Sequence, residues 1–496
     1  MANHLIDALR APSQARLDEI LMDGGVTLGA FWHGVDQLSA SLAACDVLPG
    51  DRVAVQVAKS VTALQLYLAT VQIGGVFLPL NTAYTLDEVA YLVENAEPRV
   101  IVCDPSAASE MTARHTACRV ETLGPDGTGS IVEDAPRVQP VARGPEDLAA
   151  ILYTSGTTGR SKGAMLSHSA LLSNSRTLAE LWQFNASDTL IHALPIFHTH
   201  GLFVASNIAL LSGARMVFLP GFDTDAILEA MPRATALMGV PTFYTRLLGD
   251  PRLDRARAAN MRLFVSGSAP LLAGTHRQWE ARTGHRILER YGMTETNMNT
   301  SNPYKGERRA GTVGFPLPDV ELRIMGPGGP VEKGGIGGIE VRGPNVFSGY
   351  WRMPEKTAEE LRPDGWFITG DLGQVDADGY ITIVGRLKDL IISGGFNIYP
   401  KEVEEVLDDV PGILESAVIG VPHPDFGEGV VAVIVADGSV AIDERAVQAA
   451  VSDRLAKFKQ PKRVFVVDAL PRNTMGKVQK AALRAEYAAV FQVSNS

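Results

Sequence analysis

The sequence is poor in cysteine and carries no excess of positive charge. Its 496 residues include only Cys45, Cys103 and Cys118, with no Cys-x-x-Cys spacing. Because an odd number of scattered cysteines does not build a disulfide framework, we expect reduced thiols and a cytoplasmic protein. The formal net charge of −11 argues against nucleic acid or an anionic membrane as the main partner. An acidic protein that binds anions must gather its basic residues locally.

Long apolar runs are also missing. The first ten residues have neither the apolar core nor the cleavage site of a signal peptide. The most apolar candidate, residues 61–80, contains Gln65, Gln72 and a Gly-Gly pair. We therefore expect a buried helix followed by a strand and no membrane span. The length and the 46% hydrophobic content predict two or more globular domains.

Strand and helix patterns alternate through most of the chain. Residues 51–57 alternate as a strand, 61–71 have helical spacing, and 75–80 return to a strand. Thr85 and Glu88 form a capping-box signature at the start of another helix. This alternation predicts an α/β fold with layers around parallel sheet.

The pattern changes toward the C-terminus. Glycine-rich turns between 326 and 338 predict a β-rich section. A helix from Pro400, strands at 416–421 and 430–435, and a helix ending at 454–459 predict a small α+β domain. The fold prediction is therefore a large N-terminal domain of layered α/β subdomains with a β-rich section, plus a small α+β C-terminal domain.

The densest group of phosphate-binding residue types lies at residues 153–163, YTSGTTGRSKG, directly after the apolar run 148–152. Its glycines let backbone N–H groups face a ligand, and its hydroxyls and Lys162 add donors for phosphate oxygens. The segment does not fit the Walker A pattern. On its residues alone it is a phosphate cradle or a flexible surface turn.

Three further segments have a functional and an ordinary interpretation. In YGMTET, residues 291–296, Glu295 is a candidate magnesium carboxylate, or Thr294 caps a helix N-terminus. Asp371 can accept hydrogen bonds from ribose hydroxyls, or it only forms a turn. Lys477 follows a glycine in a polar loop, where an isolated lysine is usually a surface charge.

Five motifs in this order carry a resemblance: YTSGTTGRSKG, YGMTET, TGD, GRLKDLIISGGFNIYPKEVE and PRNTMGK. They resemble the acyl-adenylate-forming superfamily of acyl-CoA synthetases, luciferases and peptide-synthetase adenylation domains, over about residues 20 to 485. The phrases HALPIFHTHG at 192–201 and YGMTETNMNT at 291–300 are similar to those of bacterial malonyl-CoA synthetases. One departure is Ser161 before the loop lysine, where many relatives have proline.

The resemblance implies an ATP-dependent malonate–CoA ligase that uses ATP, Mg²⁺ and coenzyme A. It implies a large AMP-binding domain over 1–387 and a mobile lid over 388–496, with Lys388 at the hinge. The implied phosphate loop comprises Thr154, Ser155, Gly156, Thr157, Thr158 and Lys162. It further implies that Tyr291, Gly292 and Thr294 contact AMP and that Asp371 and Arg386 bind the ribose. Glu295 and Thr154 would bind the metal, and Gly395 and Phe396 would contact CoA. The implied catalytic residues are Lys477, Glu295 and Thr154.

The predicted acyl pocket needs a cation if the acid has two carboxylates. Arg246 falls in the segment 238–248, which lines this pocket in relatives, and arginine can bind a carboxylate bidentately. Arg262 and Arg277 are alternatives, and a surface salt bridge is the ordinary interpretation of all three. The other candidate acyl-pocket residues are Ser266, Met293, His198 and His200, and the two histidines could instead be structural residues of a loop. The His-x-His spacing lacks further ligands, so zinc is not expected.

Other functions remain open at this point. The acid could be methylmalonate or another short dicarboxylic acid, and the acyl group could be loaded onto a carrier protein in trans. A non-catalytic acyl-nucleotide sensor is a different class, and the retention of Glu295 and Lys477 argues against it. The predicted partners are small molecules, namely malonate, ATP and CoA.

Overall fold

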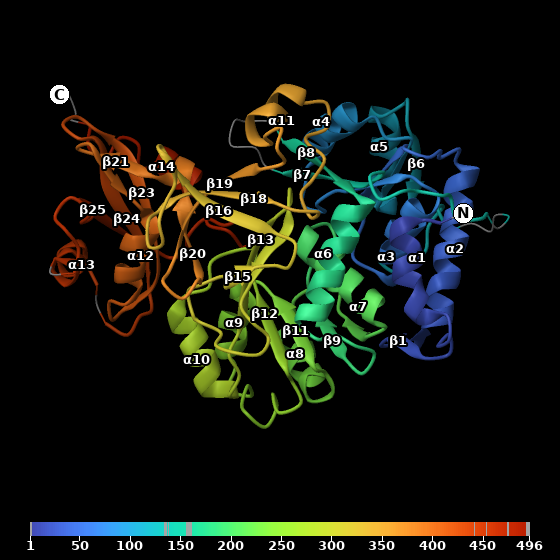
Figure 1. Ribbon diagram of the computed structural model, residues 1–496, viewed down its shortest axis with the longest axis horizontal. Helices are drawn as coiled ribbons and strands as arrows, with labels where there is room; N and C mark the ends of the chain where they lie inside the picture. Colours follow the sequence, from blue (N-terminus) through green and yellow to red (C-terminus); the bar gives the residue numbers. More distant parts are fainter. Residues whose placement is uncertain are drawn as a thin grey trace. The chain divides into compact units, whose positions relative to one another are not determined.

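A computed structural model defines the fold (Figure 1) and describes residues 2–132, 136, 138–154, 161–440, 442–452, 454–473 and 476–492. The chain divides into two compact units. The first comprises Met1–Ala310, Gly314–Glu321 and Val341–Phe367, and the second comprises Gly311–Val313, Leu322–Glu340 and Ile368–Ser496. No helix in the described ranges has both the length and the hydropathy that crossing a bilayer requires.

One sheet of the first unit has the order β6-β5-β3-β4-β7-β8. Its strands are β3 (Arg52–Gln56), β4 (Val76–Pro79), β5 (Val100–Cys103), β6 (Arg119–Thr122), β7 (Leu148–Thr154) and β8 (Lys162–Ser167). The pairs β3–β4, β3–β5 and β5–β6 are parallel, as the alternation predicted, whereas β7 and β8 are antiparallel. The glycine-rich segment therefore connects two neighbouring strand ends.

Most helices in this part of the chain begin at a residue whose side chain caps the helix. Thr85 Oγ1 accepts a hydrogen bond from Glu88 N at 3.3 Å, and Glu88 Oε2 accepts one from Thr85 N at 2.8 Å, which confirms the predicted capping box. The helices of this region are α1 (His4–Arg10), η1 (Ala11–Ser13), α2 (Leu28–Ala44), α3 (Val61–Gln72), α4 (Leu86–Ala96), η2 (Pro105–Ala107) and α5 (Ala108–Arg114).

The second sheet of the first unit has the order β15-β14-β13-β12-β11-β9-β10-β1-β2. Its strands are β1 (Ile20–Met22), β2 (Val26–Thr27), β9 (Thr189–His192), β10 (Arg215–Phe218), β11 (Ala236–Gly239), β12 (Leu263–Ser266), β13 (Leu288–Met293), β14 (Asn297–Ser301) and β15 (Phe315–Pro316). From β10 through β9, β11 and β12 to β13 the pairing is parallel. The carboxyl ends of these strands therefore share one edge, where ligands of α/β sheets bind.

The helices that follow these strands in the chain lie around this second sheet (Figure 1). They are α6 (His168–Leu181), η3 (His200–Ser206), α7 (Asn207–Ser212), α8 (Thr224–Ala230), η4 (Met231–Arg233), α9 (Pro241–Leu248) and α10 (Ala273–Thr283). The helix α11 (Pro354–Glu360) follows β18 (Gly337–Arg342) in the chain and lies near β8 of the first sheet, where Glu360 contacts Lys162 (Figure 1). The η3 segment is a π-helix, a form that frequently occurs at functional sites.

The second unit contains most of a sheet in the order β17-β16-β18-β19-β20 and a C-terminal sheet in the order β22-β21-β24-β23, with β25 paired to β24. The first set is β16 (Glu321–Gly326), β17 (Gly329–Pro330), β18 (Gly337–Arg342), β19 (Phe367–Val375) and β20 (Ile381–Arg386). The C-terminal elements are η5 (Leu387–Asp389), β21 (Ile391–Ser393), β22 (Phe396–Ile398), α12 (Pro400–Asp408), β23 (Ile413–His423), β24 (Gly427–Ala436), α13 (Glu444–Val451), β25 (Arg463–Val467) and α14 (Lys480–Glu486).

Both faces of the C-terminal sheet are apolar. Val418 packs in one buried cluster with α12 and α13, whereas its neighbour Ala417 packs in another that includes Leu483 of α14. This alternation follows the two-residue period of a strand. The predicted fold class, α/β with a small α+β C-terminal part, is confirmed.

Two details differ from the sequence expectations or stay untested. The helix predicted to end at 454–459 is wrong, because α13 ends at Val451. The two compact units divide at 367/368, and the hinge at 387/388 stays a prediction.

Candidate active site

The phosphate-loop motif and the YGMTET motif meet within the first unit. Thr154 ends β7, Lys162 begins β8, and the two residues are paired in register. Thr154 Oγ1 lies 3.5 Å from Glu295 Oε1, which is 141 positions away in the chain. The predicted loop residues Ser155, Gly156, Thr157 and Thr158 lie outside the described residues.

The YGMTET motif forms a β-hairpin and not the start of a helix. Tyr291, Gly292 and Met293 end β13, and the chain turns through residues 294–296 into the antiparallel strand β14. A Cβ atom on Gly292 would lie 1.9 Å from the Asn297 carbonyl oxygen, so this turn requires glycine. The turn buries the side chain of Glu295.

The surroundings of Glu295 fit a magnesium ion that is shared with a nucleotide. The Tyr350 hydroxyl lies 3.1 Å from Glu295 Oε1, and burial raises the pKa of this carboxyl. Magnesium takes one or two carboxylates and completes its shell with phosphate oxygens and water. The described part of the chain holds no group of three or more His, Cys, Asp or Glu that could enclose a metal. One buried carboxylate beside a threonine hydroxyl fits a magnesium ion whose other ligands are phosphate oxygens and water.

Lys162 is held by two residues that the sequence interpretation missed. Its Nζ lies 3.1 Å and 3.2 Å from the Glu360 carboxylate oxygens and 3.2 Å from the Tyr350 hydroxyl. Tyr350 and Glu360 follow Lys162 by 188 and 198 positions in the chain. No local pattern marks such residues, since only the fold brings them to Lys162.

His200, Ser266 and Met293, which were predicted to line the acyl pocket, lie at or near the carboxyl edge of the second sheet. Ser266 ends β12, Met293 ends β13, and His200 begins the π-helix η3. His200 is buried, and its Nδ1 lies 3.3 Å from the Ser268 hydroxyl. Burial and then the charge of Arg290 lower the pKa of His200 well below its ordinary value, so the imidazole is neutral at pH 7.

Arg290 is a buried charged residue close to His200 and Gly267 that the sequence interpretation did not single out. Its side chain is 3% exposed, and its Nε and Nη2 have no hydrogen-bond partner among the described residues. Burial lowers its pKa to about 9, which leaves the guanidinium charged at neutral pH. A Cβ atom on Gly267 would lie 2.4 Å from Arg290 Cζ, so glycine makes room for the guanidinium. A buried cation of this kind requires an anionic partner.

The three arginines named from the sequence have other surroundings. Arg246 is exposed on α9, with its Cζ 5.4 Å from the Phe222 ring centroid. Arg262 precedes β12 at the amino edge, and two of its nitrogens lie 2.7 Å from the carboxylate oxygens of buried Asp188. Arg277 is exposed on α10. The structure thus binds Arg262 into the fold and leaves Arg246 and Arg277 at the surface.

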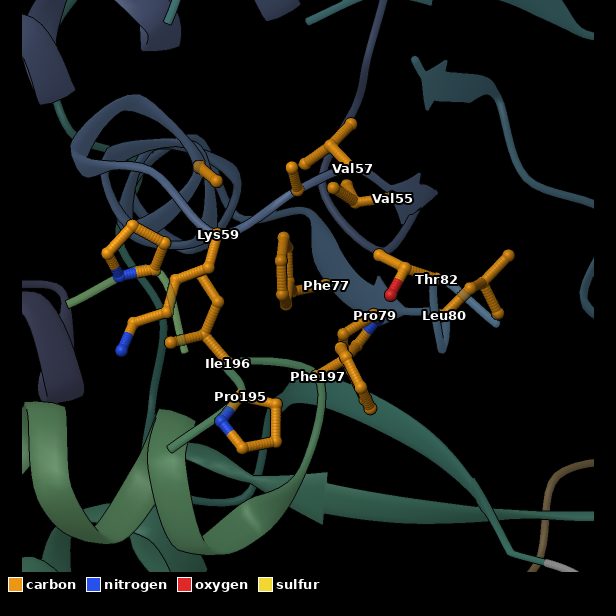
Figure 2. Close-up of a pocket in the computed structure, with 13 residues that line it drawn as sticks. Val55, Val57, Lys59, Phe77, Pro79, Leu80, Thr82, Pro195, Ile196 and Phe197 are labelled. Atoms are coloured by element: carbon orange, nitrogen blue, oxygen red, sulfur yellow. The ribbon is translucent and has the colours of Figure 1, made fainter. Parts of the chain in front are cut away.

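A cavity of about 220 Å³ lies between β3, β4 and the loop after β9 (Figure 2). Its lining is mainly apolar and includes Phe77, Pro79 and Phe197, whose ring packs on His198 at 4.7 Å. Lys59 also lines it, but its Nζ already donates to the His192 carbonyl at 2.7 Å. The cavity therefore suits an uncharged group better than a second carboxylate.

The predicted ribose residues pair with each other in the second unit. Asp371 on β19 and Arg386 on β20 are neighbours in register, and Arg386 Nε lies 2.9 Å from Asp371 Oδ1. Asp371 is buried, and its backbone N donates to Thr369 Oγ1 at 3.1 Å. This pair orients the carboxylate of the TGD motif, which lies within β19 and does not form a turn.

The other predicted residues of the second unit lie in a short 3₁₀-helix, a hairpin and a loop. Lys388 is in η5, and Gly395 adopts a φ of +81° in the hairpin between β21 and β22. Phe396 is 55% exposed and stacks on Phe458 at 4.6 Å. The backbone N of Lys477 donates to Asn473 Oδ1 at 3.0 Å, and its side chain is exposed.

Comparisons with known proteins agree over most of the chain. Residues 10–351 match the AMP-binding enzyme family and residues 402–477 match the AMP-binding enzyme C-terminal domain. The crystal structure of ATP-bound MatB from Rhodopseudomonas palustris has a TM-score of 0.96 and 56% identity, and the match covers 99% of this chain and 100% of that one.

Curated relatives at lower identity are ligases or synthases that are named for different acids. Malonate–CoA ligase from Arabidopsis thaliana is 35% identical over 480 residues, covering 88% of this chain and 78% of its own length. Feruloyl-CoA synthase from Amycolatopsis sp is 38% identical over 459 residues, covering 91% of this chain and 92% of its own length. Since the family match takes in the phosphate-loop strands and the YGMTET hairpin, this chain belongs to the AMP-binding enzyme family.

Proposed function

We propose that the protein is an ATP-dependent malonate–CoA ligase. It converts malonate and ATP to malonyl-AMP and pyrophosphate, and then malonyl-AMP and CoA to malonyl-CoA and AMP. Family membership, the likeness to ATP-bound MatB and the relative named malonate–CoA ligase support this reaction class. A relative of similar identity is named for ferulate, so the choice of acid must come from the pocket itself.

The burial of Arg290 is the main reason for proposing malonate as the acid. Malonate presents one carboxylate to ATP and must bury the other. Nε and Nη2 of Arg290, both without a partner in the described residues, form one edge of the guanidinium that can bind a carboxylate bidentately. Ser266 Oγ and His200 Nε2 are buried atoms that likewise lack a hydrogen bond there. We therefore propose Arg290, rather than Arg246, as the partner of the distal carboxylate.

In the first half-reaction the proximal carboxylate oxygen of malonate bonds to the α-phosphorus. The bond from that phosphorus to the bridging oxygen breaks, and pyrophosphate leaves. Lys162 and the phosphate loop bind the β- and γ-phosphates, and Lys477 offsets the charge that develops at the α-phosphate. Mg²⁺, held by Glu295 and Thr154, would neutralise part of the phosphate charge. The proposed AMP residues Tyr291, Gly292, Thr294, Asp371 and Arg386 hold the nucleotide.

In the second half-reaction the CoA sulfur bonds to the acyl carbon and the thiol loses its proton. The bond from the acyl carbon to the phosphate oxygen breaks, and AMP leaves. Gly395 and Phe396 guide the CoA arm in this proposal. Because one site serves both steps, the lid must rotate about Lys388 between them.

Replacing Lys388 by proline should slow one half-reaction and spare the other. Proline fixes φ near −65°, a value typical of 3₁₀-helices such as η5, and so removes the freedom that a hinge needs. Pyrophosphate release and thioester formation from malonyl-AMP are measured separately. A folded variant with wild-type rates in both steps would show that Lys388 is not the hinge.

A panel of carboxylic acids tests the proposed function. With ATP, Mg²⁺ and CoA, malonate should give CoA-dependent AMP formation with the highest kcat/KM, and methylmalonate should be the next best. Acetate and butyrate lack a distal carboxylate and should be poor substrates. Equal activity with butyrate and malonate would contradict malonate as the substrate.

We also propose that the protein works in the cytoplasm. Cys45 and Cys103 are buried and free in the structure. Free thiols of this kind suit a reducing compartment.

A further inference from the structure

Tyr350 lies between the two charged groups that the proposed function assigns to ATP and magnesium. Its hydroxyl is 3.1 Å from Glu295 Oε1, 2.6 Å from Glu360 Oε2 and 3.2 Å from Lys162 Nζ. The side chain is 2% exposed, and its ring packs edge-on against Phe347 at 4.8 Å. A rigid aromatic side chain therefore bridges the metal carboxylate and the phosphate lysine.

Glu360 supplies the anchor for this bridge. Its carboxylate accepts from Lys162 at 3.1 Å and 3.2 Å and also pairs with Lys356 at 2.9 Å. A phenol is protonated at neutral pH, so the Tyr350 hydroxyl can donate a hydrogen bond. The Tyr350 O–H faces two carboxylate acceptors, Glu360 Oε2 at 2.6 Å and Glu295 Oε1 at 3.1 Å, and the phenol oxygen accepts from Lys162 Nζ at 3.2 Å. Glu360 thus fixes both the hydroxyl of Tyr350 and the ammonium of Lys162.

We propose that Tyr350 and Glu360 are positioning residues that hold Glu295 and Lys162 at a fixed spacing for a magnesium–triphosphate. This inference rests on the proposed function and adds two residues to its site. Groups that orient a metal ligand are worth about 10- to 100-fold in metal affinity. Neither residue needs to touch the metal or the nucleotide, because each acts through a side chain that does.

The direct test is metal binding by the Tyr350→Phe variant. This change keeps the ring against Phe347 and removes the hydroxyl. Mn²⁺, whose binding is followed by electron paramagnetic resonance, replaces Mg²⁺, and α,β-methylene-ATP replaces ATP because adenylation cannot cleave it. The Kd for Mn²⁺ with this analogue should rise by about 10- to 100-fold. The KM for malonate at saturating metal should stay near the wild-type value.

Tyr67→Phe is the matched control, since Tyr67 is also fully buried and its hydroxyl meets Asn207 at 3.4 Å. It should bind Mn²⁺ like the wild type. Equal Mn²⁺ affinity of Tyr350→Phe and wild type would overturn the positioning role alone. A wild-type protein that bound no Mn²⁺ with the analogue would overturn the proposed function as well.

A double-mutant cycle separates positioning from general loss of stability. Glu360→Ala should weaken Mn²⁺ binding, because it releases both Tyr350 and Lys162. Its effect combined with Tyr350→Phe should be less than the sum of the two, since they interrupt one connected network. Fully additive effects would overturn the proposal. Glu359→Ala, which removes the neighbouring exposed carboxylate paired with Lys356 at 2.7 Å, should leave Mn²⁺ binding unchanged.

Discussion

Replacing Lys477 by alanine should stop formation of malonyl-AMP but leave transfer of the acyl group from preformed malonyl-AMP to CoA. Attack of a carboxylate on the α-phosphate brings two anions together, so a cation is needed where charge develops. Loss of one such preorganised group lowers kcat by about 10²–10³-fold. Thioester formation joins a thiol to an acyl carbon and has no such demand on Lys477.

The loop around Lys477 allows this change without general damage. Asn473 N donates to the Lys477 carbonyl at 2.9 Å, and Arg472 donates to the Gly476 carbonyl at 2.6 Å. These bonds do not use the Lys477 ammonium, so alanine should keep the backbone of the loop.

The two half-reactions are measured as pyrophosphate release from ATP and malonate, and as malonyl-CoA formation from malonyl-AMP. Lys480→Ala is the control, because it removes the same charge from the same segment, where Lys480 pairs with Glu404 at 2.6 Å. It should retain adenylation. Equal loss of both half-reactions in Lys477→Ala would show that the lysine does not serve adenylation alone.

The sequence predicted those elements whose signals are local. Thr85 and Glu88 lie three residues apart, so the capping box that begins α4 could be recognised without knowledge of the fold. Pro400 marks the first residue of α12 for the same reason. The strands of the parallel sheet carry apolar runs, which follow from burial on both faces.

The end of α13 could not be predicted in this way. Val447, Val451 and Leu455 keep helical spacing, yet the helix ends at Val451. The Gln460 side chain donates to the carbonyls of Ser452 at 3.0 Å and Leu455 at 2.8 Å. These bonds satisfy backbone oxygens that a longer helix would have used, and they exist only after the chain has turned.

The residues of the candidate site likewise fall into those that local motifs predict and those that only the fold brings together. Lys162, Glu295 and Lys477 belong to motifs that can be recognised in the sequence. Tyr350 and Glu360 belong to none of these motifs, and only the fold brings them to Lys162 and Glu295. Arg290 lies between Glu289 and Tyr291 and looks like an ordinary charged strand residue in the sequence. Its burial depends on the space beside Gly267, which directly follows the neighbouring strand β12. This space exists only in the folded protein, so the sequence around Arg290 does not reveal it.

Replacing Arg290 by methionine should remove activity with malonate and spare activity with butyrate. Methionine keeps an unbranched, flexible side chain, although a shorter one, and cannot pair with a carboxylate. Removing one partner of a buried ion pair costs about 3–5 kcal/mol. At about 1.4 kcal/mol per decade, kcat/KM for malonate should fall by roughly 10²–10³-fold or more. Butyrate has no distal charge and should be used equally well or better.

Thermal unfolding distinguishes a binding role from a structural one. Without substrate, wild-type Arg290 is a buried cation whose Nε and Nη2 lack partners in the described residues, so methionine should not lower the Tm. Malonate should raise the Tm of the wild type and not that of the variant.

Arg246→Met is the matched control for this last prediction. Arg246 is exposed on α9, and its loss should leave malonate activity within a few fold of the wild type. If only Arg246→Met lost malonate, the distal carboxylate would belong to Arg246. If Arg290→Met lost malonate and butyrate by the same factor, Arg290 would support the fold instead of the substrate. Only the selective loss of malonate assigns the second carboxylate to Arg290, because only a group that touches that carboxylate can tell the two acids apart.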